Sequence, residues 1–493
     1  MTPAGTIEGR AEAPILLVEA PYRAAYGGGG IAVAHYFPLG LGYLASYLEQ
    51  QGRRVELLVE SPRVDFWREL ADRLANRTYL CVGISSMTSA FPMALRIARA
   101  VKQCPRPVPV VVGGAHATGV GGQALRAHAE IDFLVLGEGE ITLWELVRWL
   151  GDRPRQDGAD AGPAHILGLA WRDSTGTIAI NPPRPFHRQL EDFPPPARHL
   201  VNLADFSLHA HTTGGRGHGA TMLSSRGCPF GCLFCAAHLT DGRKYRVHSQ
   251  ERILSELRDL RDRHGIRYVF FEDDVITVMR RRLLALCQAL EAADLGMTFG
   301  CFSTVEHFDD EAAEAMARAG FRLVIFGMES GDPAVLARLG KSKGATLDAA
   351  RDAIERCRRH GMRSYASFIV GFPFETPAQI DRTLAFGRAL RPSMLTFNML
   401  VPFPGTPLFD QRRHTPEDPD GWSAFVTSRT PPFDMNPGIS AQSLRQRVDR
   451  AHLRYYLHPW TVWRMLREVR SWWEVRALVT GFAGMVARLG SHR

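Results

Sequence analysis

Short apolar runs alternate with helical patterns in two separate blocks of this chain, and this alternation limits the fold more than any other feature. Parallel strands joined by helices produce such a pattern, because each parallel pair needs a long crossover between its strands. The first block covers residues 14–150 and predicts a doubly wound parallel sheet of the Rossmann type. Its predicted strands are Ile15–Glu19, Val55–Val59, Leu80–Ser85, Val108–Val112 and Phe133–Leu136, and its predicted helices are Leu39–Glu49, Phe66–Leu74, Ala90–Val101, Gln123–His128 and Thr142–Leu150.

A second block of the same kind covers residues 219–410. Its predicted strands are Thr221–Ser225, Tyr268–Glu272, Thr298–Ser303, Leu323–Met328, Ser364–Val370 and Met394–Leu400. Strands with helices between them in this number predict a partial (β/α)6 barrel. The whole chain is therefore expected to be α/β.

Three segments lie outside the two blocks. Residues 151–218 are interrupted by Gly, Pro and Asp, and predict a linker that contains a hairpin with arms at 167–172 and 177–181. Residues 1–13 are expected to form a flexible N-terminus, and residues 411–493 a helical C-terminal region.

The composition excludes several classes of protein. The 493 residues are 45% hydrophobic and 22% charged, which suits several packed domains and excludes a disordered or fibrous chain. The eight cysteines are too few for a secreted disulfide scaffold. The first residues lack the apolar core of a signal peptide, and no later run reaches the roughly 18 apolar residues of a spanning helix. We expect a cytoplasmic protein.

Most of the net charge of +8 lies in residues 444–493, where ten arginines face three acids. The same segment contains Trp460, Trp463, Trp472 and Trp473. We expect a helical cap whose tryptophans pack on the barrel while its arginines face water. A peripheral membrane contact through these helices stays open, whereas no nucleic acid is expected as a partner.

The sharpest local feature is a group of three cysteines, Cys228, Cys232 and Cys235, directly after a predicted strand. Thiolates this close together are soft ligands that can converge on one metal centre. A zinc ion would need a fourth protein ligand, for which His238 is the candidate. An iron–sulfur cluster held by three cysteines instead leaves one iron open for a substrate.

The spacing Cys-x3-Cys-x-aromatic-Cys, with Phe234 in the aromatic position, resembles the radical S-adenosylmethionine (SAM) superfamily. The resemblance implies a [4Fe–4S] cluster on the three cysteines, with SAM bound to the open iron and Phe234 beside it. It also implies reductive cleavage of SAM to a 5′-deoxyadenosyl radical, fed by an electron donor such as flavodoxin or ferredoxin.

Acidic residues at two later strand ends fit this resemblance. Glu272, Asp273 and Asp274 lie at the end of the second barrel strand, where carboxylates suit the ammonium group of SAM. The run Gly327–Gly331 resembles the G-x-E-S-G strand end of the family, which implies that Glu329 accepts hydrogen bonds from the ribose hydroxyls.

Two further parts of the predicted SAM site are less regular. Gly371 and Pro373 resemble the later strand ends that flank the adenine. Many relatives carry an arginine after the third barrel strand, whereas this chain has Ser303 at that strand end and no arginine after it. Ser303, or a residue elsewhere, is therefore expected to donate to the SAM carboxylate.

Glycines and hydroxyl residues follow the predicted strand ends of the first block, where an open parallel sheet binds its ligand. Glycines let a large planar ligand approach the backbone, and hydroxyls can bond to its amides. No phosphate-binding glycine pattern stands in the right place, so a nucleotide is a poor candidate. The first of these glycine runs is Gly27–Gly30.

This pattern resembles the cobalamin-binding domain ahead of the barrel in one branch of radical SAM enzymes, which includes cobalamin-dependent methylases, a hopanoid methylase and the anaerobic magnesium-protoporphyrin cyclase. The histidine motif that ligates cobalt in other cobalamin proteins is absent, so we expect His116 to be a loop residue bonded to the backbone. The cobalamin contacts implied by the resemblance are Gly40, Leu41, Ser85, Ser86, Thr88, Gly113, Gly114, His116, Gly137, Glu138, Gly139 and Glu140.

The resemblance implies an enzyme of secondary metabolism that methylates an unactivated carbon of a small molecule, a lipid or another natural product. A radical SAM cyclase, rearrangement enzyme, dehydratase or oxidative enzyme of the same architecture, with or without cobalamin, is the alternative. A methylthiotransferase is disfavoured, because only Cys81 and Cys104 lie in the first block. An alternative from a different class is a nucleic-acid- or membrane-binding protein that acts through the basic tail.

Overall fold

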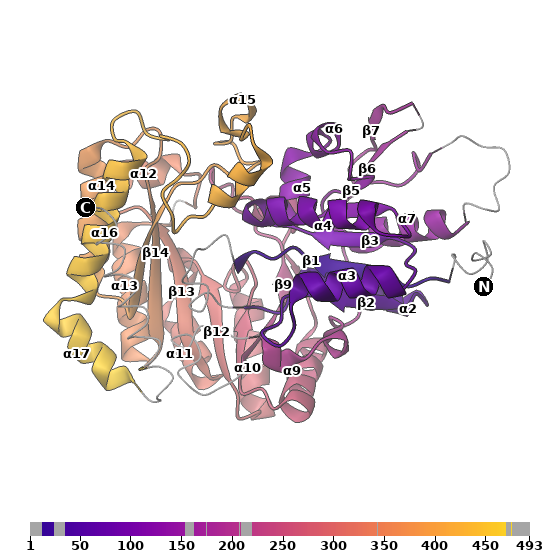
Figure 1. Cartoon of the computed structure of the whole chain (residues 1–493). Coiled ribbons are helices and arrows are strands. Elements are labelled where there is room, and N and C mark those ends of the chain that lie inside the picture. The colour runs from indigo at the N-terminus through magenta and orange to yellow at the C-terminus, as the bar shows by residue number, and fades with distance from the viewer. Residues whose placement is uncertain are drawn as a thin grey trace.

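The computed structural model describes residues 12–23, 35–152, 162–173, 175–206, 208, 219–342, 344–469 and 475. Two sheets stand side by side with helices against their faces (Figure 1). Most of the expected flexible N-terminus, the glycine run Gly27–Gly30, and the tryptophans Trp472 and Trp473 lie outside the described residues.

The first sheet has the strand order β2-β1-β3-β4-β5-β6-β7, and its first five strands run parallel. The predicted doubly wound sheet is confirmed, with its strand order reversing between β1 and β3. These strands are mostly apolar because both of their faces are buried. They are β1 (Ile15–Glu19), β2 (Val55–Leu58), β3 (Val82–Ser85), β4 (Val110–Gly113) and β5 (Phe133–Val135).

Helices cover both faces of the first sheet. One face packs against α2 (Leu39–Gln50) and α7 (Glu140–Asp152). The other packs against α3 (Phe66–Asn76), α4 (Phe91–Gln103), α5 (Ala115–Val120) and α6 (Gln123–Ala127). The short helix α5 was not predicted, because its Gly-rich sequence resembles a loop.

The segment expected to be a linker contributes to this sheet. Its hairpin, β6 (Leu169–Arg172) and β7 (Ile178–Ile180), pairs antiparallel with β5 and extends the sheet edge. Leu169 and Ala170 are fully buried, one in each of the two cores that flank the sheet. Turn-forming residues predicted the hairpin. They did not predict that it pairs with β5, because local sequence does not show which strand is at the edge of a sheet.

The second sheet has six parallel strands in the order β8-β11-β12-β13-β14-β15, which confirms the predicted partial barrel. The strands are β8 (Gly219–Met222), β11 (Tyr268–Phe271), β12 (Thr298–Ser303), β13 (Phe321–Glu329), β14 (Arg363–Val370) and β15 (Met394–Met399). The helices are α9 (Gln250–His264), α10 (Arg280–Ala293), α11 (Asp310–Arg318), α12 (Pro333–Arg338), α13 (Leu347–Arg359) and α14 (Pro377–Leu390).

The first barrel strand is shorter than predicted. The expected strand Thr221–Ser225 divides into β8 and a separate strand, β9 (Ser225–Arg226), which pairs antiparallel with β10 (Arg246–Val247). The three cysteines therefore lie in a loop that leaves β9 and returns at β10. Ser224 accounts for the break, because its N–H donates to the Asp273 carboxylate at 3.0 Å and not to a neighbouring strand.

The chain after β15 returns to the first sheet. The segment that contains α15 (Gln411–His414) and the 3-10 helix η10 (Pro419–Ala424) reaches across to the side of α4 and α5 (Figure 1). Trp422 and Phe425 are buried there in the first core, and the Trp422 ring lies 4.7 Å from the ring of His116. The two sheets are thus tied by this segment as well as by the chain between them.

The C-terminal helices differ from the expected cap. Helix α16 (Ala441–Tyr456) packs against β15 and α14, but in α17 (Pro459–Glu468) the residue Trp463 is 55% exposed. Arg464 instead turns inward and donates to the Ser393 carbonyl at 2.6 Å. The assignment of tryptophans to the barrel and arginines to water was therefore wrong at these two positions. Within the part of the chain that is described, no helix is long and apolar enough to cross a membrane.

Candidate active site

A cavity of about 490 Å³ lies between the two sheets. It is bordered by the carboxyl ends of the strands of the first sheet and by the ends of β8 and β11 of the second. Its volume is in the range of ligand pockets, which run from about 300 to 1,000 Å³. The first domain contributes mainly glycines and apolar side chains, among them Tyr36, Phe37 and Leu44. The second contributes polar and charged groups, which are Thr221, Ser225, Arg226, Thr240, Asp241, Glu272 and Asp274, together with Leu223.

Glycines open the first side of the cavity to a flat ligand. A Cβ built on Gly40 meets nothing within 4 Å, and one built on Gly137 comes no closer than 3.9 Å to another atom, the Leu239 carbonyl oxygen. Gly114 has φ +95°, and a Cβ there would lie 2.9 Å from the Ser86 carbonyl oxygen. These glycines therefore keep side chains out of the space beside the strand ends. A large planar cofactor such as cobalamin fits a surface of this kind.

The structure brings most of the residues predicted to contact cobalamin to the cavity wall and leaves three away from it. Those on the wall are Gly40, Leu41, Ser85, Gly113, Gly114, Gly137, Glu138, Gly139 and Glu140. Ser86 donates its hydroxyl to the Met87 carbonyl at 2.8 Å, and Thr88 is buried in a 3-10 helix. Neither lines the cavity.

His116 is the third residue away from the wall. We expected a loop residue, but it lies in α5, 1% exposed, with its ring 4.0 Å from Phe91. Burial, followed by repulsion from His128, lowers the pKa of His116 to about 3. The neutral ring is therefore part of an aromatic core and not a group that faces a ligand.

The three cysteines of the loop are half-buried free thiols. Burial raises the pKa of Cys228 to about 11 and that of Cys232 to about 12. Metal binding would deprotonate such thiols, since thiolate is the ligand. The Ala237 N–H also donates to the Cys235 sulfur at 3.5 Å, as backbone amides do around iron–sulfur clusters.

The donor set suits a cluster better than a zinc ion. Among the described residues, no three His, Cys, Asp or Glu side chains converge on one point, as a single ion requires. In a cluster each cysteine binds a different iron, so the sulfurs need not converge. The zinc alternative relied on His238, whose Nδ1 lies 3.1 Å from the Cys235 carbonyl oxygen.

The acids after β11 divide into two roles. Asp273 is fully buried and accepts from the N–H of Ser224 at 3.0 Å and from its hydroxyl at 2.7 Å, so it braces the chain that leads into the cysteine loop. Glu272 and Asp274 line the cavity instead. Burial raises the pKa of each to about 7, with a further contribution from nearby carboxylates. A cation in the cavity would favour their charged forms.

Glu329 forms a buried pair that the sequence did not reveal in full. It has φ +65° at a register shift between β13 and β14, and it accepts from Lys341 Nζ at 3.0 Å. Lys341 was not predicted as a site residue. It follows a segment that lies on the cysteine loop, where the Leu233 N–H donates to the Leu339 carbonyl at 3.0 Å. The only feature of the sequence that could have indicated Lys341 is its position directly after Gly340.

The remaining residues predicted for SAM lie off the cavity wall. The Ser303 hydroxyl is 2.9 Å from the Thr277 hydroxyl, and the Phe234 ring lies 6.0 Å from the Phe372 ring. The Gly371 N–H donates to Glu375 at 2.7 Å, and Pro373 is exposed. Their roles toward SAM stay predictions.

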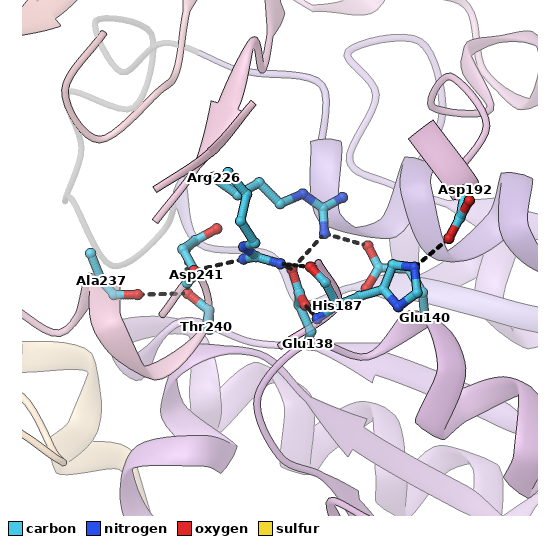
Figure 2. A network of polar contacts seen from close by, with 9 residues as sticks. Glu138, Glu140, His187, Asp192, Arg226, Ala237, Thr240 and Asp241 are labelled. Carbon is cyan, nitrogen blue, oxygen red and sulfur yellow. Dashed lines mark hydrogen bonds and ion pairs between the residues drawn. The ribbon is translucent and has the colours of Figure 1, made fainter. Parts of the chain in front are cut away.

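An ion-pair network joins the two domains beside the cavity (Figure 2). Glu140, the first residue of α7, and Glu138, two residues before it, point toward Arg226 of β9. Glu138 also pairs with Arg246 of β10. Neither arginine was predicted as a site residue. The signal was the position of Arg226, two residues before Cys228.

Comparison with known families agrees with this geometry. Residues 32–147 match the model of the B12 binding domain, and residues 222–387 match that of the radical SAM superfamily. An uncharacterized methyltransferase of Pyrococcus horikoshii is 30% identical over 86% of this chain and 88% of its own length. An anaerobic magnesium-protoporphyrin IX monomethyl ester cyclase of Rubrivivax gelatinosus is 25% identical over 78% of this chain and 68% of its own.

Among solved structures, the radical SAM methyltransferase TsrM from Kitasatospora setae, with cobalamin and a [4Fe–4S] cluster bound, is similar with a TM-score of 0.65 at 21% identity. The match covers 80% of this chain and 74% of that chain. This chain belongs to the cobalamin-dependent radical SAM methyltransferases. Its cofactors are a [4Fe–4S] cluster, SAM and cobalamin, so the resemblance found in the sequence is confirmed.

Proposed function

We propose that this enzyme methylates an unactivated carbon of a small molecule, a lipid or another natural product that binds between its two domains. One observation carries the proposal, which is that a single cavity is walled by the glycines of the first sheet and by the acids of the second. When bound, the cluster and SAM supply a carbon radical and cobalamin supplies the methyl group.

The residues of the chain would hold and orient these groups. Cys228, Cys232 and Cys235 would bind the cluster. Glu272 and Asp274 would accept from the ammonium of SAM, and their position on the cavity wall, which Asp273 does not reach, supports this role. The glycines at the ends of β4 and β5 would let the corrin ring lie against the backbone.

The apolar part of the wall would protect the chemistry. Phe37, Leu41 and Leu143 face the cavity from the first domain, and Leu223 from the second. A carbon radical abstracts hydrogen from whatever it meets, so excluding water and mobile side chains favours the intended substrate.

Methyl-labelled SAM tests the proposal. The reconstituted, reduced enzyme is incubated with methyl-labelled SAM and extracts of small molecules and lipids, and products are analysed by mass spectrometry. A product that carries the label supports methyl transfer to substrate. Conversion of a substrate without label would overturn it.

Cyclisation is a second candidate, because a relative named as a cyclase is similar over 78% of this chain. An unlabelled product with a new ring would identify it in the same experiment.

Two partners belong to the proposal as well. Flavodoxin or ferredoxin would supply the electron for SAM cleavage. This is tested by reducing the enzyme with either protein in place of the chemical reductant dithionite and measuring SAM cleavage.

Helix α17 exposes Val462, Trp463 and Leu466 beside Arg467, which supports a peripheral membrane contact. Loss of co-sedimentation with anionic vesicles in Trp463→Ala and Leu466→Ala is the expected result, and unchanged co-sedimentation would contradict it.

A further inference from the structure

The strands β9 and β10, which we call the neck of the cysteine loop because they close it, carry two arginines that face each other. Strands β9 and β10 pair antiparallel with Arg226 directly opposite Arg246, and all three cysteines lie in the chain between them. The neck is tight, because a Cβ on Gly227 would lie 2.3 Å from the Lys244 carbonyl oxygen. Like charges directly opposite one another destabilise a strand pair. Closing this loop is therefore favoured by carboxylates close to the two arginines, and Asp241 of the loop itself acts on both of them.

The ion pairs of both arginines are made by glutamates of the other domain. Glu138 accepts from Arg246 Nη1 at 2.6 Å and from Arg226 Nη1 at 3.2 Å, and Glu140 accepts from Arg226 Nη1 at 2.7 Å. All four side chains are between 6% and 8% exposed. Figure 2 shows both glutamates turned toward Arg226. Salt screens buried ion pairs of this kind only weakly. Removing one partner is strongly destabilising, because it leaves the other charge buried and unpaired, unlike in pairs on the surface.

The position of Glu138 is unusual, because it stands between two glycines of the cavity wall. Gly137 and Gly139 flank it, and its own side chain lines the cavity with Arg226. Its second oxygen accepts from the His187 N–H at 2.9 Å, which fixes the carboxylate. Through Arg246 it also reaches the interior of the cysteine loop, since Arg246 Nη2 donates to the Asp241 carbonyl at 2.7 Å.

We propose that Glu138 is a positioning residue that sets the distance between the cobalamin site and the cluster site. It joins the glycine loop that would support the corrin ring to the neck of the loop that holds the cluster, and acts on the reaction through Arg226 and Arg246. The proposal rests on the two cofactor sites and not on the fate of the methyl group. It can therefore fail or hold independently of the proposed function.

A distance measurement tests this role without a substrate. In the reduced holoenzyme, cob(II)alamin and the [4Fe–4S]⁺ cluster each carry an electron spin, and pulsed electron paramagnetic resonance reports the distance between them. We expect a narrow distance distribution in the wild type. In Glu138→Gln, which keeps the shape but removes the charge, the distribution measured in protein that carries both cofactors is expected to broaden or shift by about 1 Å or more.

Two further variants separate positioning from general stability. Glu314→Gln makes the same change in an exposed surface pair with Arg318 and should leave the distance distribution as in the wild type. The double variant Glu138→Gln with Arg246→Gln restores the charge balance and should narrow the distribution again in part. If Glu138→Gln fails to retain either cofactor, the milder Arg246→Lys takes its place. A wild-type distance distribution in the single variant Glu138→Gln, or in Arg246→Lys where it takes its place, in protein that carries both cofactors, would overturn the proposal.

Discussion

The two sheets meet the same cavity with opposite kinds of surface. The first sheet faces it mainly with glycines and apolar side chains, and its two glutamates there, Glu138 and Glu140, are paired with arginine. The second faces it with the carboxylates of Asp241, Glu272 and Asp274 and continues into a loop of thiols. A corrin is large, flat and bonded along its edge, so it needs room beside the backbone. A cluster and a zwitterionic nucleoside need charged atoms at fixed points. The difference teaches that each domain supplies the kind of surface that one of the two cofactors needs.

The largest expected effect comes from removing the thiols. In the variant with Cys228, Cys232 and Cys235 replaced by alanine, iron content and 5′-deoxyadenosine release should fall to background, because no thiolate remains to bind iron. Cobalamin retention should stay within about twofold of the wild type, since the glycine wall is unchanged. Iron analysis, chromatography and the corrin absorption band measure the three quantities. Loss of cobalamin together with iron would show that the two surfaces are not separate.

The converse change fills the glycine side. Gly40→Trp places an indole in the open space beside α2, where a Cβ meets no atom within 4 Å. Cobalamin affinity should fall by at least about tenfold, because the ring occupies the space of the ligand, while iron content is retained. Gly40→Ala is the matched control and should have a small effect. Equal affinity in the wild type and Gly40→Trp, measured by titration of the apoprotein, would place cobalamin elsewhere.

An intermediate effect is expected from the acids of the second surface. Glu272 and Asp274 have pKa values raised to about 7 by burial. Each raised pKa stabilises the folded protein fully below the ordinary carboxyl range, and this contribution is lost as pH rises through about 7. The melting temperature of the ligand-free protein should therefore fall between pH 5 and pH 8, by about 5 °C.

Neutral variants and SAM sharpen this result. In Glu272→Gln with Asp274→Asn the decrease should flatten, since neither side chain then titrates. SAM affinity should rise over the same pH range in the wild type only, because the charged acids attract its ammonium. A melting temperature with the same pH dependence in both proteins would show that these acids do not titrate near pH 7.

The sequence predicted the two surfaces unequally, for a physical reason. The cysteine motif and the strand alternation identified the barrel, the loop and the family, because thiol spacing and apolar periodicity are local. The ion pairs of Glu138 with Arg226 and Arg246 were missed, since they join segments 88 and 108 residues apart. The sequence also did not predict that Asp273 is buried while Glu272 and Asp274 line the cavity. This difference depends on which of the three carboxylates accepts hydrogen bonds from Ser224 and Ser225.

The smallest expected effect tests a residue that the sequence placed on the wrong surface. His116 is packed between Phe91 and Trp422, with its Nδ1 buried and without a hydrogen-bond partner among the described residues. In His116→Phe an aromatic ring of similar size removes that unsatisfied atom, so stability should be unchanged or higher by about 1 kcal/mol. Cobalamin affinity should stay within about twofold of the wild type. Chemical denaturation and titration with cobalamin check both values. A large loss of cobalamin affinity with normal stability would contradict this. It would mean that α5 and the segment of Trp422 move when cobalamin binds, so that His116 contacts the cofactor.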